Sequence, residues 1–119
     1  MSVTSERVLK SSPGMVGLFA RAGAAMIPGA SRLPVIGAGA RSPDIPDVVL
    51  ALEGVTIDAD RLAGYDRVCS FPLRDRLPAT YPHVLAFPLH LALMTDSSFP
   101  FPALGLVHVA NRILQHRPI

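Results

Sequence analysis

The sequence has little charge, a single cysteine and no long apolar run, and each shortage excludes a class of protein. Only 17% of its 119 residues are charged and 50% are hydrophobic, which excludes a wholly disordered chain. This length allows one domain at most, with a modest core. Cys69 cannot form an internal disulfide, which fits a reducing, cytoplasmic setting. No stretch of about eighteen apolar residues occurs, so we expect no membrane span.

Lysine is almost absent as well, because Lys10 is the one lysine among 11 basic residues. The arginines are spread along the chain and form no basic stripe, so a nucleic-acid partner is not expected. Arg7 and Lys10 precede an apolar segment, residues 15–30, that is similar to a signal peptide. Arg21 interrupts the centre of this segment, so we favour a mature helix. A short amphipathic surface helix is the alternative.

Residues 1–47 are predicted to form an N-terminal helix followed by a Pro/Gly-rich arm. Ser12 and Pro13 supply an N-cap and a proline for the first turn. Four residues recur at helical spacing and predict a stripe that faces the core: Val16, Phe19, Gly23 and Met26. Residues 28–47 are rich in proline, glycine, alanine and serine, which is typical of an extended arm. Its GAGARS stretch lacks the preceding strand and the Lys-Ser/Thr pair of a phosphate-binding loop, which favours an ordinary loop.

Two strands are predicted in the remainder of the chain. Residues 48–57 (VVLALEGVTI) are rich in β-branched and aliphatic side chains, and Gly54 indicates a bulge. Residues 104–114 (LGLVHVANRIL) alternate between two faces and predict a second strand.

A helix is predicted over residues 59–69, where Asp58 can act as the N-cap and Asp60 suits the first turn. Leu62, Tyr65 and Cys69 fall on one face of this helix. We therefore expect Cys69 to be a buried apolar residue rather than a nucleophile.

The loop that follows, SFPLRDRLPA, is bounded by prolines and carries charge. Arg74, Asp75 and Arg76 are expected to form a solvated surface. The alternative is that one of the two arginines contacts a phosphate, because a guanidinium suits phosphate geometry.

Residues 80–96 (TYPHVLAFPLHLALMTD) are apolar on most faces of a helix, which predicts a buried helix. Thr80 or Tyr81 can cap it, and Pro82 fits its first turn. Pro88 removes one backbone hydrogen bond and should kink the helix.

The histidines of this helix give no sign of a metal or catalytic centre. His83 and His90 are seven residues apart, about 10 Å along a helix axis, too far to bind one metal ion. The helix has no acid before Asp96, and the chain has no nucleophile elbow, Walker loop or Cys-x-x-Cys pair. We therefore predict no metal and no cofactor.

Residues 61–113 resemble the N-terminal half of MaoC-like dehydratases. Within that family they resemble the actinobacterial double-hotdog 3-hydroxyacyl-thioester dehydratases, also described as (R)-specific enoyl-CoA hydratases. The resemblance is carried by LPATYPHVLAFPLHLALMTD, residues 77–96, and by FPALGLVHVANRI, residues 101–113. The segment GLFARAGAAMIPGASRLP, residues 17–34, is similar as well.

This resemblance implies an α+β fold, a partial hotdog in which an antiparallel sheet wraps the helix over residues 80–95. Residues 1–47 would be the helix and arm, and residues 48–119 a truncated N-terminal portion of the hotdog. The implied substrate is an acyl-CoA or acyl-carrier-protein thioester. The family hydrates it through an Asp and a His in a G-D-x-N-P-[ILV]-H motif.

That motif is absent from this sequence, so no catalytic residue is carried over. The resemblance leaves four candidate substrate-binding residues: Tyr81, His83, Phe87 and His90. The chain would be a fragment or substrate-side half of a dehydratase that needs a catalytic hotdog half or subunit. The alternatives are a non-catalytic hotdog subunit that binds acyl chains or pairs with a catalytic partner, and a non-functional gene remnant.

Overall fold

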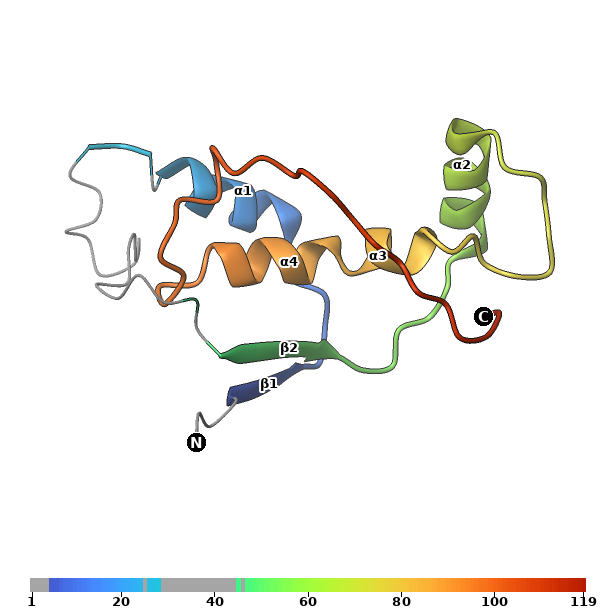
Figure 1. The fold of residues 1–119 in the computed structure, drawn as a ribbon, viewed down its shortest axis with the longest axis horizontal. Coiled ribbons are helices and arrows are strands. Elements are labelled where there is room, and N and C mark those ends of the chain that lie inside the picture. The colour runs from blue at the N-terminus through green and yellow to red at the C-terminus, as the bar shows by residue number, and fades with distance from the viewer. Residues whose placement is uncertain (1–4, 25, 29–44, 46) are drawn as a thin grey trace. The chain divides into compact units, whose positions relative to one another are not determined.

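The computed structural model describes residues 5–24, 26–28, 45 and 47–119, and these form an α+β arrangement. The elements in chain order are β1 (Ser5–Leu9), α1 (Met15–Ala24), β2 (Val48–Leu52), α2 (Ala59–Cys69), α3 (Tyr81–Leu85) and α4 (Phe87–Met94) (Figure 1). The GAGARS loop and most of the expected arm lie outside the described residues. The expected domain division after residue 47 stays a prediction.

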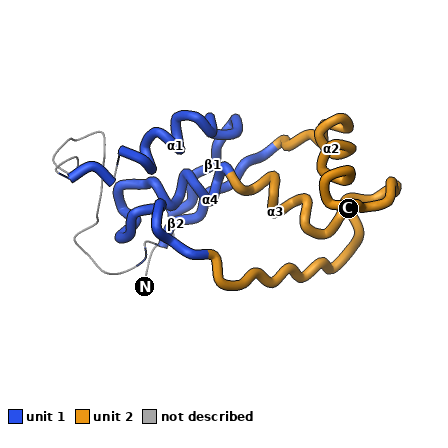
Figure 2. The backbone as a smooth tube through the Cα atoms, turned by 90° about the horizontal axis from the view of Figure 1, so that it is seen from above, with its two compact units in different colours: residues 1–53, 88–107 blue, residues 54–87, 108–119 orange. Residues whose placement is uncertain are grey.

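The chain divides into two compact units, shown in different colours in Figure 2. Unit 1 consists of residues 1–53 and 88–107, and unit 2 of residues 54–87 and 108–119. Each unit is described by itself.

Unit 1 contains a two-stranded sheet in which β1 and β2 are parallel, with Ser5 opposite Val48 and Leu9 opposite Leu52. The resemblance implied an antiparallel sheet, and the pattern of residues 5–9 did not suggest a strand. A parallel pair requires a long connection, and here that connection contains α1. β2 ends five residues before the predicted end of the strand. Gly54 follows with φ +68°, a left-handed conformation that leaves the extended path.

α1 buries a different face from the predicted one. Leu18 and Ala22, one turn apart, are 6% and 1% exposed. Val16 and Phe19 are 85% and 50% exposed, and Met26 is also exposed, so the predicted core-facing stripe was wrong. α1 (MVGLFARAGA) carries apolar side chains around most of its circumference, so its local pattern does not select the buried face.

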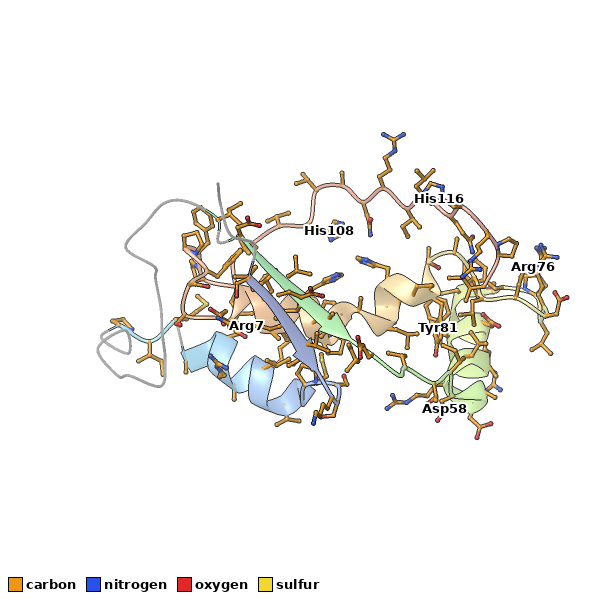
Figure 3. The ribbon with its side chains drawn as sticks, turned by 90° about the horizontal axis from the view of Figure 1, so that it is seen from below. Arg7, Asp58, Arg76, Tyr81, His108 and His116 are labelled. Atoms are coloured by element: carbon orange, nitrogen blue, oxygen red, sulfur yellow. The ribbon has the colours of Figure 1, made fainter. Side chains whose placement is uncertain are left out.

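Polar contacts tie the other parts of unit 1 to the end of α4. Arg7 of β1, labelled in Figure 3, donates through Nη1 to Oδ2 of Asp96 at 2.9 Å. Ser98 donates to Asp96 Oδ1 from its hydroxyl at 2.6 Å and its backbone N–H at 2.9 Å. Arg21 of α1 donates to the carbonyl of Thr95 at 3.1 Å. The hydroxyl of Ser98 is the largest cause that lowers the pKa of Asp96, and Arg7 adds to it.

In unit 2, α2 has the predicted N-terminus. Asp58, labelled in Figure 3, accepts the N–H of Arg61 at 3.0 Å, and Asp60 lies in the first turn. The predicted burial of Cys69 was wrong, because its side chain is exposed. Cys69 is the last residue of α2, one turn beyond Tyr65, whose ring makes the contacts with α3 described below.

The predicted single helix over residues 80–96 is two helices. Pro82 occupies the first turn of α3 as expected, but α3 ends at Leu85. The N–H of Ala86 contacts the carbonyls of Pro82 and Val84. Pro88 has no N–H to continue the α-helical bond to Val84, so the chain breaks where a kink was expected.

The predicted burial on most faces of these helices was also wrong. Tyr81 in α3 and Leu91 in α4 are 3% and 4% exposed, but Val84 and Phe87 are 45% and 42% exposed. An apolar helix is buried only when other elements surround it, and the described residues supply few such elements.

The second predicted strand is absent from the described part of the chain. Residues 106–119 run extended and pair with neither β1 nor β2. Val107 and Val109 are 80% and 93% exposed. Alternation alone does not make a strand, because a strand also needs a neighbouring strand within hydrogen-bonding distance.

We expect the ionised carboxylate of Asp96 to stabilise unit 1 in a pH-dependent way. Its folded pKa is lower than the ordinary 3.8, so the stabilisation is present above pH 3.8. It is lost as the pH falls through the folded pKa. Asp96→Asn keeps an acceptor for Ser98 but removes the charge. Its deficit in unfolding free energy should be about 1 kcal/mol or less at pH 7, because Arg7 is largely solvated, and should shrink at about pH 2.5.

Urea denaturation followed by circular dichroism at both pH values measures this difference. Asp75→Asn is the matched control, because Asp75 is 90% exposed at its side chain. A deficit of the Asp96 variant that stays constant between the two pH values would contradict the assignment.

Candidate functional site

The structure places the four predicted site residues in different surroundings. Tyr81 is buried in α3, and His83 is half-buried in the same helix. Phe87 exposes 42% of its surface at the start of α4. His90 is exposed and belongs to unit 1, whereas the other three belong to unit 2. The four residues are therefore not shown to form one site.

Tyr81 belongs to an aromatic cluster centred on Tyr65 of α2. The Tyr65 ring lies 5.1 Å from the ring of Tyr81 at 53°, and 6.0 Å from that of Phe71 at 58°. These tilted geometries are favourable for aromatic pairs. The Tyr65 hydroxyl also shares a 2.6 Å hydrogen bond with Oγ1 of Thr80. Tyr65 thus joins α2, the loop after it and the start of α3, and Tyr81 acts here through packing.

His83 faces the extended C-terminal segment. Its Nε2 lies 3.1 Å from Nδ2 of Asn111, and its ring is edge-to-face with His108 at 6.4 Å and 90°. Figure 3 shows His108 on that segment. The amide of Asn111 and the imidazole of His83 therefore share a hydrogen bond. This cluster can hydrogen-bond a polar ligand. Among the described residues, no group of three His, Cys, Asp or Glu side chains is suited to hold a metal ion.

A cavity of about 460 Å³ lies in the loop between α2 and α3. Small-molecule sites in proteins have this size and combine apolar walls with a few polar groups. The residues that line it are Phe71, Pro72, Arg74, Arg76, Leu77, Pro78, Ala79, Thr80 and Gln115. None of the four predicted site residues is among them.

Sequence reasoning missed three polar residues beside these two places. It assigned His108, Asn111 and Gln115 to a strand or to the chain beyond it, with no role. Their positions depend on where residues 108–119 lie in unit 2, and no local pattern encodes that. Arg74 and Arg76 left a signal, an Arg-x-Arg pair in a proline-bounded loop, for which a phosphate contact was the alternative interpretation.

We expect the Tyr65 cluster to determine the stability of unit 2. Tyr81→Ala removes a buried ring and should cost about 3 kcal/mol or more. Tyr65→Phe keeps the ring contacts and removes the hydroxyl, and should cost about 1 kcal/mol. Amide hydrogen exchange of residues 59–85 measures both losses. Val68→Ala is the control, because Val68 is 85% exposed. Equal losses in the Tyr81 and Val68 variants would rule out the packing role.

The chain is similar to a characterised class of enzyme. Over 90 residues, 76% of the chain, it is 37% identical to 3-hydroxyacyl-thioester dehydratase X of Mycobacterium tuberculosis. The chain spans about a third of that relative, since the matched part covers 31% of its length. No protein-family model matches the chain, and no solved structure does. No helix in the described ranges is long and apolar enough to cross a membrane. The similarity supports a relationship to the 3-hydroxyacyl-thioester dehydratases.

Proposed function

We propose that this chain is the substrate-side part of a 3-hydroxyacyl-thioester dehydratase of the MaoC-like, double-hotdog type. The observation that carries the proposal is the 37% identity over 90 residues to a dehydratase of that name. The α+β content of the structure is compatible with a partial hotdog. The substrate would be an acyl-CoA or acyl-carrier-protein thioester, and the setting cytoplasmic fatty-acid metabolism.

The chain contributes binding surface rather than acid–base chemistry. Hydration of an enoyl thioester needs a group that activates water and donors that polarise the thioester carbonyl. The G-D-x-N-P-[ILV]-H motif that would supply the Asp and His is absent from the 119 residues. We therefore assign no catalytic residue to this chain, and propose that a catalytic hotdog half or subunit supplies the motif.

Exposed apolar side chains support both the proposed acyl-binding surface and the proposed contact with a catalytic partner. Val84 and Phe87 expose 45% and 42% of their surface, and offer a place for an acyl chain. His83 and His90 stay candidates for polar contacts with the thioester, and Tyr81 supports α3 from within the Tyr65 cluster. On the extended segment Val109 is 93% exposed. Exposed apolar residues in such number are typical of protein contact surfaces.

The purified chain should not hydrate crotonyl-CoA by itself. Hydration is followed by the loss of the enoyl-thioester absorbance, with a hotdog protein that carries the G-D-x-N-P-[ILV]-H motif as the positive arm. Mixing the two should raise the turnover of the catalytic protein on longer enoyl thioesters. Measurable turnover by the chain alone would overturn the proposal. A complex that binds acyl thioesters without any change in turnover would favour the non-catalytic subunit.

Phe87→Asp tests the acyl surface within the assembled pair. We expect KM for a long-chain enoyl thioester to rise about tenfold, which corresponds to about 1.4 kcal/mol of lost apolar contact, while kcat changes little. Val68→Asp is the matched control, since Val68 is exposed on α2 of the same unit. Equal effects of the two variants would exclude a specific role for Phe87.

A further inference from the structure

The cavity between α2 and α3 combines apolar walls with two guanidinium groups. Phe71, Leu77 and Pro78 supply apolar surface, and Arg74 and Arg76 line the same space. The volume of about 460 Å³ suits a small organic molecule rather than a single ion. The lining is therefore suited to a ligand that has both an apolar chain and a charged group.

The charge of this lining is positive. Asp75, the acid between the two arginines, does not line the cavity and meets Nε of Arg76 at 3.6 Å. Both side chains are largely solvated, at 56% exposed for Arg76 and 90% for Asp75, so this ion pair neutralises little. In the part of the chain that the structure describes, no carboxylate lies within ion-pair distance of Arg74. The cavity thus selects an anion.

Two guanidinium groups favour a phosphate over a carboxylate. Each presents a planar fork of N–H donors, and a phosphate offers three acceptor oxygens and nearly two negative charges to share between them. Gln115 adds an amide, and Thr80 a hydroxyl that is already oriented by Tyr65 at 2.6 Å.

Hydrogen bonds and a ring contact fix the walls of the cavity in the absence of a ligand. The N–H of Phe71 donates to the carbonyl of Asp66 at 2.8 Å, and the Phe71 ring contacts Tyr65. The N–H of Leu77 donates to the carbonyl of Ile119 at 2.8 Å. A loop fixed at both sides loses little conformational entropy on binding, which favours affinity.

We propose that this cavity binds a phosphate ester attached to an apolar or weakly polar chain, through Arg74 and Arg76. The choice of ligand rests on the proposed function: a thioester carrier has such a group in its phosphopantetheine arm. The arm occurs free as a phosphate monoester, in coenzyme A as a diphosphate and on a carrier protein as a singly charged phosphodiester.

Isothermal titration of the whole chain tests the site with 4′-phosphopantetheine, pantetheine without phosphate, coenzyme A, inorganic phosphate and holo-acyl carrier protein. We expect 4′-phosphopantetheine to bind at least tenfold more tightly than pantetheine or inorganic phosphate, with an affinity that falls as salt rises. Coenzyme A or the carrier protein should also bind more tightly than pantetheine, and the tighter of the two identifies the source of the arm.

The double variant Arg74→Gln/Arg76→Gln should weaken this binding at least tenfold, and Arg74→Lys should lie between it and the wild type. Arg67→Gln, an exposed arginine of α2 outside the cavity, is the control and should bind as the wild type does. Circular dichroism confirms that each variant folds. Equal binding of 4′-phosphopantetheine and pantetheine, no binding by the folded chain, or no effect of the double variant would each overturn the inference. Arginine-dependent binding without any effect of the chain on dehydratase turnover would retain the site and refute the proposed function.

Discussion

The contacts of Tyr65 hold together the part of the molecule in which its candidate ligand sites lie. One side chain on α2 contacts the ring of Phe71, the ring of Tyr81 and the hydroxyl of Thr80. Phe71 lies at the beginning of the loop after α2, Thr80 at its end and Tyr81 at the start of α3. The walls of the cavity and the position of His83 on α3 both depend on this cluster. A ring with a polar hydroxyl suits this position, because it packs and forms a hydrogen bond at once.

The described residues bury little apolar surface beyond such local clusters. Leu18, Ala22, Tyr81 and Leu91 are the buried hydrophobic residues of the described ranges, while many large apolar side chains remain exposed. Polar contacts such as the pair of Arg7 and Asp96 add order, but exposed ion pairs contribute modestly. This balance fits a chain that presents apolar surface to an acyl ligand and to a partner, as the proposed function requires.

The proposed function assigns substrate binding and chemistry to different parts of the dehydratase. The similarity to 3-hydroxyacyl-thioester dehydratase X covers 76% of this chain but 31% of that relative. An enzyme that divides its work in this way can place the carrier arm and the acyl chain on one part and the water-activating groups on another. Under the proposal, the cavity with Arg74 and Arg76 and the exposed surface at Phe87 would be two such binding elements within unit 2.

Local signals in the sequence were reliable where the chemistry is local. Asp58 caps α2 because its carboxylate reaches an N–H three residues away, and Pro82 starts α3 because its fixed φ suits a first turn. Pro88 was correctly read as an interruption, although it separates two helices instead of bending one. The relationship to dehydratases also came from the residues of the chain alone, since a pattern of identities needs no coordinates.

Only the tertiary structure decided which faces are buried and which segments meet. The apolar pattern of α1 allowed either Phe19 or Leu18 to face inward, and the neighbours of α1 selected Leu18. The alternation in residues 104–114 predicted a strand, but the segment pairs with neither β1 nor β2, and Asn111 lies beside His83. The sequence by itself determined where α2 and α3 begin and to which enzymes the chain is similar. The structure decided burial and long-range contacts, because these depend on atoms that are distant along the chain.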